Sequence, residues 1–302
     1  MTNRNKGWIE RQGVRIAVSR WGEAGSRKPP LLLVHGTGFV SEVWDEVACG
    51  LASDNTVYAL DRRGHGASHK SAADQYHFLD FALDLCAVIE ALDLSDMLGV
   101  GHSAGATDLL LAAKLMPQRF SRLFVMEPTI MDPRMKRGDG AQLSDESQAI
   151  MRSVLCRRPV FESAPAAFRR LRAAPAFEKW SEPALRAYVE HGFEPLPDGR
   201  VRLLCRPELE AAMLRPIFEA MEQIYAGDER GNPFHWLSEI KCPVCVSTAE
   251  RSDVIYKEMA ARAVARIPVV SQWTFDGVGH CVAQEAPALV LEAIEAFKAG
   301  AG

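Results

Sequence analysis

Short apolar runs that alternate with helical segments constrain the fold of this chain more than any other sequence feature. Each run has the length of a strand and most have a continuous apolar centre, as expected of strands with both faces buried. The runs occupy residues 29–36, 55–61, 96–101, 122–128, 242–248 and 269–275. Apolar residues at helical spacing occupy residues 76–93, 103–116, 254–267 and 286–300. This order predicts an α/β fold, with a mainly parallel central sheet flanked by helices.

The stretch between residues 131 and 235 departs from this pattern. It has no buried-strand run, many prolines interrupt its short helical stretches, and its basic and acidic residues are equal in number. Balanced charge of this kind is typical of a solvated, salt-bridged surface. We therefore expect residues 1–130 and 236–302 to form the core domain and residues 131–235 to form a helical insertion.

The composition limits the partners of this chain of 302 residues. Hydrophobic residues make up 48% and charged residues 25%, as in soluble globular proteins. A net charge of −4 offers no basic surplus for nucleic acid. The first residues are polar, and no apolar run has the length of a membrane span. We expect a cytoplasmic protein that binds neither nucleic acid nor membrane.

Seven cysteines are present, and two of them form a C-x-x-C pair at Cys242 and Cys245. A second such pair is absent, and the pair lies at the start of an apolar run whose alternate side chains point to opposite faces. Core packing therefore explains the pair better than a zinc site or a redox couple. We expect reduced cysteines, no metal and no cofactor.

The segment "LGVGHSAGAT" (98–107) places Ser103 between Gly101 and Gly105, where the strand of residues 96–101 is expected to turn into the helix of residues 103–116. A G-x-S-x-G sequence in that context is typical of a nucleophile elbow. The turn strains the serine backbone, so its neighbours must be small for strand and helix to approach. Ser103 is therefore the candidate nucleophile.

Four motifs together resemble the α/β-hydrolase family, over about two-thirds of the chain. "LLLVHGTG" (31–38) resembles the strand and oxyanion turn of the family, and "ALDRRGHGAS" (59–68) resembles its D-x-R-G-x-G-x-S loop. "VGHSAG" (100–105) corresponds to the nucleophile elbow, and "FDGVGHCVAQEAP" (275–287) resembles the loop that carries the catalytic histidine. The motifs occur in the order of the family.

The resemblance implies a role for each motif. Ser103 would attack an acyl carbon, and His280 would take the serine proton and later pass it to the leaving group. The backbone N–H groups of Thr37 and Ala104 would form the oxyanion hole. His35 would brace the turn that carries Thr37. In the same way, residues 131–235 would form a lid over Ser103.

Two carboxylates are candidates for the acid that orients His280. In most of the family the acid follows the strand that here spans residues 242–248, but its usual register falls on Ser252, with Asp253 one residue later. Some branches place the acid after the earlier strand of residues 122–128, where Glu127 stands. Asp253 also has the pattern of a helix N-cap. We favour Glu127 and keep Asp253 as the alternative.

A serine nucleophile argues against haloalkane dehalogenase and epoxide hydrolase chemistry, because those branches of the family use an aspartate at the elbow. We expect a cofactor-free serine hydrolase that cleaves a small or medium-sized apolar carboxylic ester or lactone, as a monomer or homodimer. One alternative is hydrolysis of a carbon–carbon bond in a vinylogous diketone. Another is a non-catalytic ligand-binding protein on a hydrolase scaffold.

Apolar and aromatic side chains are the candidates for contact with the substrate. Each of them could instead pack within the insertion or the core. The candidates are Phe39, Phe193, Met213, Phe218, Met221 and Tyr225.

Overall fold

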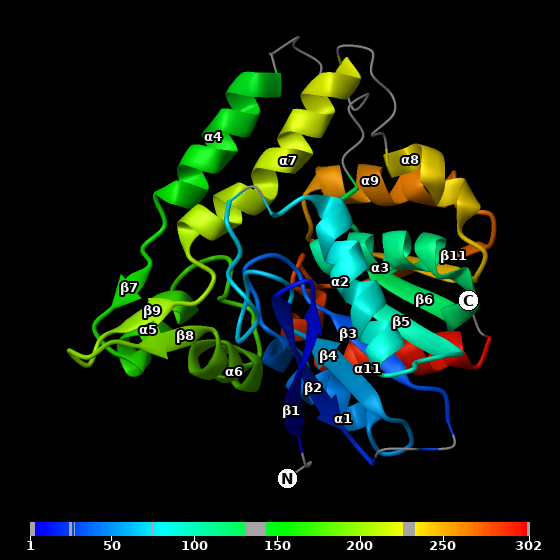
Figure 1. The fold of residues 1–302 in the computed structure, drawn as a ribbon, viewed down its shortest axis with the longest axis horizontal. Helices are drawn as coiled ribbons and strands as arrows, with labels where there is room; N and C mark the ends of the chain where they lie inside the picture. Colours follow the sequence, from blue (N-terminus) through cyan, green and yellow to red (C-terminus); the bar gives the residue numbers. More distant parts are fainter. Residues whose placement is uncertain are drawn as a thin grey trace.

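The computed structural model describes residues 4–23, 26, 28–73, 75–130, 143–225 and 233–300. Its main sheet has eight strands in the order β1-β2-β4-β3-β5-β6-β10-β11 (Figure 1). β1 and β2 form an antiparallel hairpin, β2 pairs antiparallel with β4, and the other pairings are parallel. The strands are β1 (Asn5–Arg11), β2 (Val14–Trp21), β3 (Leu31–Val34), β4 (Val57–Leu60), β5 (Met97–His102), β6 (Phe120–Met126), β10 (Val244–Ala249) and β11 (Val270–Phe275). The predicted fold class is confirmed.

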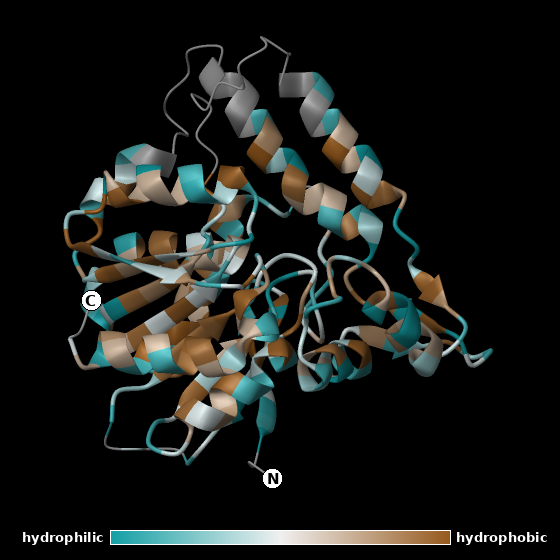
Figure 2. Ribbon diagram, turned by 180° about the vertical axis from the view of Figure 1, so that it is seen from behind, coloured by the Kyte–Doolittle hydropathy of each residue, from teal (hydrophilic) through white to brown (hydrophobic). Residues whose placement is uncertain are grey.

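Helices cover both faces of this sheet because alternate strand residues point to opposite sides. Leu31 and Leu33 belong to a hydrophobic cluster with α1 and α11, whereas Leu32 and Val34 belong to a second cluster with α2, α3 and α9. Figure 2 shows hydrophobic residues along the central strands between these layers. The helices are α1 (Asp45–Leu51), α2 (Phe78–Ala91), α3 (Ala104–Leu115), α8 (Pro233–Trp236), α9 (Val254–Val264), α10 (Val282–Glu285) and α11 (Pro287–Lys298), with short 3₁₀ turns η1 (Ser41–Trp44), η2 (Pro117–Arg119) and η4 (Leu237–Glu239).

The insertion between β6 and α8, expected to be mainly helical, contains a small sheet as well as helices. The small sheet is antiparallel, in the order β7-β9-β8. Its strands have two or three residues each, too short to produce a recognisable apolar alternation in the sequence. The elements are α4 (Leu143–Leu155), β7 (Val160–Phe161), α5 (Ala164–Arg172), α6 (Glu182–His191), β8 (Phe193–Pro195), β9 (Val201–Leu203) and α7 (Pro207–Tyr225).

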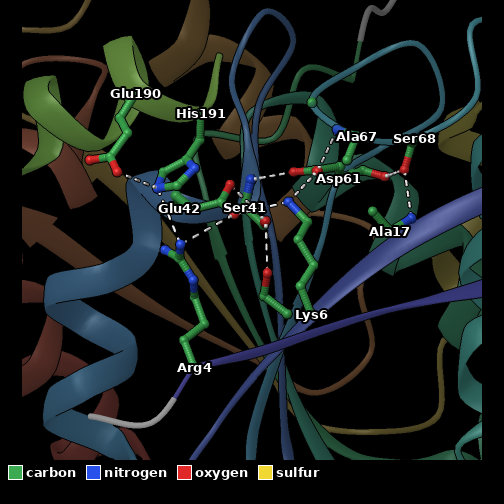
Figure 3. Close-up of polar contacts among 12 residues, drawn as sticks. Arg4, Lys6, Ala17, Ser41, Glu42, Asp61, Ala67, Ser68, Glu190 and His191 are labelled. Atoms are coloured by element: carbon green, nitrogen blue, oxygen red, sulfur yellow. Dashed lines mark hydrogen bonds and ion pairs between the residues drawn. The ribbon is translucent and has the colours of Figure 1, made fainter. Parts of the chain in front are cut away.

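A buried ionic network ties the N-terminal hairpin to the loops after β3 and β4 (Figure 3). Lys6 Nζ donates to Glu42 Oε1 and to Asp61 Oδ2, each at 2.9 Å. Both carboxylates are fully buried, and Asp61 Oδ1 also accepts the backbone N–H of Ser41 at 2.7 Å. Burial alone would raise the pKa of Asp61, but the Lys6 charge and the Ser41 hydrogen bond hold it well below its usual value. Lys6 thus neutralises two carboxylates beside the turn of residues 35–40.

Replacing Lys6 with methionine is expected to lower the free energy of unfolding by about 3–5 kcal/mol, because the buried Asp61 loses its ion pair and the buried Glu42 keeps only the Arg4 guanidinium, 4.0 Å away. Urea unfolding followed by circular dichroism measures the change. Lys28→Met is the matched control, since it removes a lysine whose ion pair with Asp54 is exposed on both sides. Equal stability of the Lys6→Met variant and the control would show that the network contributes little.

No helix within the described residues is long and apolar enough to cross a membrane. Cys242 and Cys245 are buried, as expected of residues that pack in the core. Over those same ranges of the chain, histidine, cysteine and acidic side chains nowhere gather into a group that could hold a metal ion.

Candidate active site

Ser103 occupies the turn between β5 and α3 with backbone angles φ +55° and ψ −124°. A positive φ is strained for any residue that carries a Cβ, so the surroundings must hold it. The Ser103 N–H donates to the Met126 carbonyl at 2.9 Å, which fixes the turn to β6. A Cβ at Gly105 would overlap the His35 carbonyl oxygen, and one at Gly101 would lie 2.6 Å from the Cα of Ala106. The small residues around the serine are therefore a steric requirement.

His280 and Glu127 complete a hydrogen-bonded chain with this serine. Nδ1 of His280 lies 2.6 Å from Glu127 Oε2, and Nε2 lies 3.3 Å from Ser103 Oγ. The carboxylate can only accept, so Nδ1 carries the proton and Nε2 is left as the acceptor for the Ser103 hydroxyl. His280 follows β11, Ser103 follows β5 and Glu127 follows β6. The carboxyl ends of β5, β6 and β11, which lie at the same edge of the parallel part of the sheet, thus bring the three side chains together.

Glu127 is held on both of its oxygens by the neighbouring strand end. Oε1 accepts the Ala249 N–H at 2.8 Å, and Oε2 accepts the Ser252 hydroxyl at 2.7 Å. The side chain is fully buried, and its backbone has a φ of +46°. Ser252 occupies the register in which most of the family carries the acid, and it here donates to the carboxylate that reaches His280.

Asp253, the alternative acid, caps a helix. It is the N-cap of α9, and its Oδ1 accepts the Ile255 N–H at 3.0 Å. The residue is exposed. Of the two candidate carboxylates, the structure brings Glu127 to His280 and leaves Asp253 at the start of a helix.

The two expected oxyanion donors lie in different segments, Thr37 in the turn after β3 and Ala104 at the start of α3. Among the described residues, neither the Thr37 N–H nor the Ala104 N–H donates a hydrogen bond. His35 braces the turn, because its Nδ1–H donates to the Gly36 carbonyl at 2.7 Å and its Nε2 accepts the Arg62 N–H at 3.0 Å. Burial lowers the pKa of His35 to about 4, so the ring stays neutral and keeps an acceptor nitrogen.

A second buried histidine fixes the same turn. Nε2 of His65 accepts the Gly38 N–H at 2.9 Å, and its Nδ1–H donates to the Arg63 carbonyl at 3.0 Å. The Thr37 hydroxyl accepts from Arg62 Nη1 at 3.3 Å. The loop of residues 59–68 therefore sets the shape of the turn that carries Thr37.

Two residues to which the sequence assigned no role also contact His280. Nε2–H of His102 donates to the His280 carbonyl at 2.8 Å, and burial holds the pKa of His102 well below its usual value. The Tyr256 ring stacks on the imidazole, with ring centroids 3.9 Å apart and planes inclined by 17°. His102 lies within the elbow motif, but no sequence pattern marks Tyr256.

The residues expected to contact the substrate divide into different environments. Phe39 stacks on His102 with a centroid distance of 6.2 Å, and the His102 ring lies 4.7 Å from that of His280. Phe193 packs on Phe161 inside the insertion, and Met213 lies in a buried cluster with Tyr76. Apolar side chains of the same type can pack inside the protein or contact a substrate, and both roles give the same sequence pattern.

Three further candidates lie on α7. Phe218 is buried. The side chains of Met221 and Tyr225 lie outside the described residues. None of the three is assigned to the site.

The model of the alpha/beta hydrolase family matches residues 31–293, and the chain belongs to that family. A 2-(acetamidomethylene)succinate hydrolase from Mesorhizobium japonicum is 25% identical over 276 residues, which cover 89% of this chain and 87% of the relative. A non-heme chloroperoxidase from Streptomyces lividans is 30% identical over 146 residues, covering 46% of this chain and 51% of that protein. A haloalkane dehalogenase from Mesorhizobium japonicum is 34% identical over 105 residues, covering 35% of this chain and 34% of the relative.

Solved structures share the fold at lower identity. The structure of an E-2-(acetamidomethylene)succinate hydrolase has a TM-score of 0.78 at 22% identity and covers 98% of this chain and 99% of its own. A thioesterase domain from the curacin biosynthetic pathway has a TM-score of 0.77 at 22% identity and covers 97% of this chain and 99% of its own. At this level of identity the likeness establishes the fold.

Proposed function

We propose that this protein is a serine hydrolase in which Ser103 is the nucleophile, His280 the general base and Glu127 the acid that orients it. The observation that carries the proposal is the continuous hydrogen-bonded chain from Ser103 Oγ through His280 to Glu127. The unused N–H groups of Thr37 and Ala104 support it, because they are suited to receive the negative charge of a tetrahedral intermediate.

The proposed reaction involves the substrate, water and groups of this chain. Ser103 Oγ attacks the acyl carbon, His280 Nε2 takes the serine proton, and the carbonyl π electrons move to the oxygen held by the two N–H groups. Collapse of the intermediate breaks the bond to the leaving alkoxide, which takes the proton from His280. Water then gives a proton to His280 and attacks the acyl-enzyme, and release of the carboxylic acid restores the Ser103 hydroxyl.

We propose a carboxylic ester or lactone as the substrate class, with a carbon–carbon bond in a vinylogous diketone as the alternative. A serine at the elbow favours an acyl-enzyme and disfavours the aspartate chemistry of dehalogenases. The insertion is the proposed lid over Ser103. Its Trp180 and Tyr188 rings lie 5.0 and 5.9 Å from Phe39, and Glu210 Oε2 lies 4.0 Å from the position of a Cβ at Gly38.

A substrate panel tests this proposal. p-Nitrophenyl esters of increasing acyl length, aliphatic lactones, ring-cleavage diketones and 2-(acetamidomethylene)succinate are each incubated with the wild type and with Ser103→Ala as the blank. We expect turnover of an ester or lactone by the wild type alone. Cleavage of the diketones with slow ester turnover would instead support the carbon–carbon alternative.

A further inference from the structure

The stacked contact between Tyr256 and His280 lies outside the three residues of the proposed triad. Tyr256 belongs to the first turn of α9, and Asp253 caps that helix by accepting the Ile255 N–H. The Tyr256 N–H donates to the Asp253 carbonyl at 3.1 Å. The capped helix end thus fixes the backbone from which the tyrosine ring reaches the imidazole.

In this contact the face of the Tyr256 ring lies over the His280 imidazole, which gains a positive charge when it takes the serine proton. The centroids are 3.9 Å apart and the planes are inclined by only 17°. Glu127 and Ser103 already occupy the two nitrogens of the imidazole, so the stacked ring acts on its face. An aromatic face close to a cation stabilises it through the ring quadrupole, and the effect grows when water is excluded.

The charged and titratable groups around His280 come from several elements. Glu127 after β6 binds Nδ1, His102 at the end of β5 lies with its ring centroid 4.7 Å away, and Cys281 is the next residue in the chain. Burial raises the pKa of the Cys281 thiol and of Tyr256 to about 12, and it holds the pKa of His102 well below its usual value. These three groups are therefore uncharged near neutral pH, and Asp253 is turned to the cap of α9.

We propose that Tyr256 is a positioning residue of the reaction, whose ring holds the imidazole between Ser103 and Glu127 and stabilises the charge that His280 gains from the serine proton. The inference rests on the proposed function of His280 as the general base. The stacked face supplies both effects, and the phenolic hydroxyl is not required for either.

Two substitutions separate the ring from the hydroxyl. Tyr256→Phe keeps the aromatic face, whereas Tyr256→Leu keeps an apolar side chain over the imidazole and removes the face. The rates kcat and kcat/KM for p-nitrophenyl acetate are measured against pH, together with the pH dependence of Ser103 labelling by a fluorophosphonate probe. Thermal unfolding of both variants shows that each is folded.

For Tyr256→Leu we expect kcat to fall about tenfold with little change in KM, and the acidic limb of kcat/KM to move to lower pH by about half to one unit. The direction follows because an imidazolium without the aromatic face is less stable and loses its proton at lower pH. Tyr256→Phe is expected to behave as the wild type. A merely structural role would lower the rate and leave the limb in place.

Several outcomes would overturn the inference. The inference fails if the acidic limb of kcat/KM stays at the wild-type pH in Tyr256→Leu. It also fails if kcat falls as much in Tyr256→Phe as in Tyr256→Leu. If Tyr256→Leu does not fold, Tyr256→Met provides the same comparison. A wild type that neither hydrolyses the ester nor is labelled at Ser103 would reject the proposed function itself, whereas a labelled wild type with an unshifted limb in the leucine variant would reject the role of Tyr256 alone.

Discussion

Ser103→Ala is expected to lower kcat by about 10⁴- to 10⁶-fold for any substrate that the wild type turns over, because the variant lacks the atom that attacks. Ligand binding should change little, since the oxyanion turn and the insertion are untouched. The backbone φ is +55° with a Cβ present in both proteins, so stability should also be similar. Initial rates and thermal unfolding measure both quantities.

Ser53→Ala is the matched control, because Ser53 is an exposed serine on a different surface. Its rate should equal that of the wild type. Activity of Ser103→Ala within tenfold of the wild type would mean that another group attacks the substrate, and the mechanism proposed here would then be wrong.

Glu127→Gln is expected to lower kcat by about 10³- to 10⁴-fold, in line with the loss of the negative charge that stabilises the imidazolium and selects its tautomer. The amide retains the size of the carboxylate, but its nitrogen cannot accept from the donors that converge on Glu127, the His280 Nδ1–H, the Ala249 N–H and the Ser252 hydroxyl. Steady-state kinetics on the best substrate of the panel measure the loss.

Asp253→Asn provides the contrast for the second carboxylate. Asparagine caps a helix about as well as aspartate, so this variant should keep nearly all of its activity. The opposite ranking, a large loss in Asp253→Asn and a small one in Glu127→Gln, would move the role of the acid to Asp253.

The main sheet could be predicted because its buried strands appear in the sequence as short apolar runs. The run "LLLV" of β3 is apolar at every position, and its residues divide between two hydrophobic clusters on opposite faces of the sheet. The small sheet of the insertion has no such apolar runs. β7, β8 and β9 are only two or three residues long, and their pairing depends on contacts across the chain.

The candidate site shows the same limit. Ser103 and His280 could be singled out because each lies in a motif whose order along the chain matches the family. The choice between Glu127 and Asp253 remained open, since it depends on how closely β6 and β10 end beside the His280 loop. The contact between Tyr256 and His280 could not be predicted, because a tyrosine in the first turn of a helix has no distinctive spacing from a histidine that follows the next strand.

The measurement that tests the central claim most directly is mass spectrometry of the protein after reaction with a fluorophosphonate probe. The account predicts one covalent adduct, located by peptide mapping on Ser103, with no adduct in Ser103→Ala and much slower labelling in Glu127→Gln. An adduct on another residue, or none on the folded wild type, would contradict the account and favour a ligand-binding protein on a hydrolase scaffold.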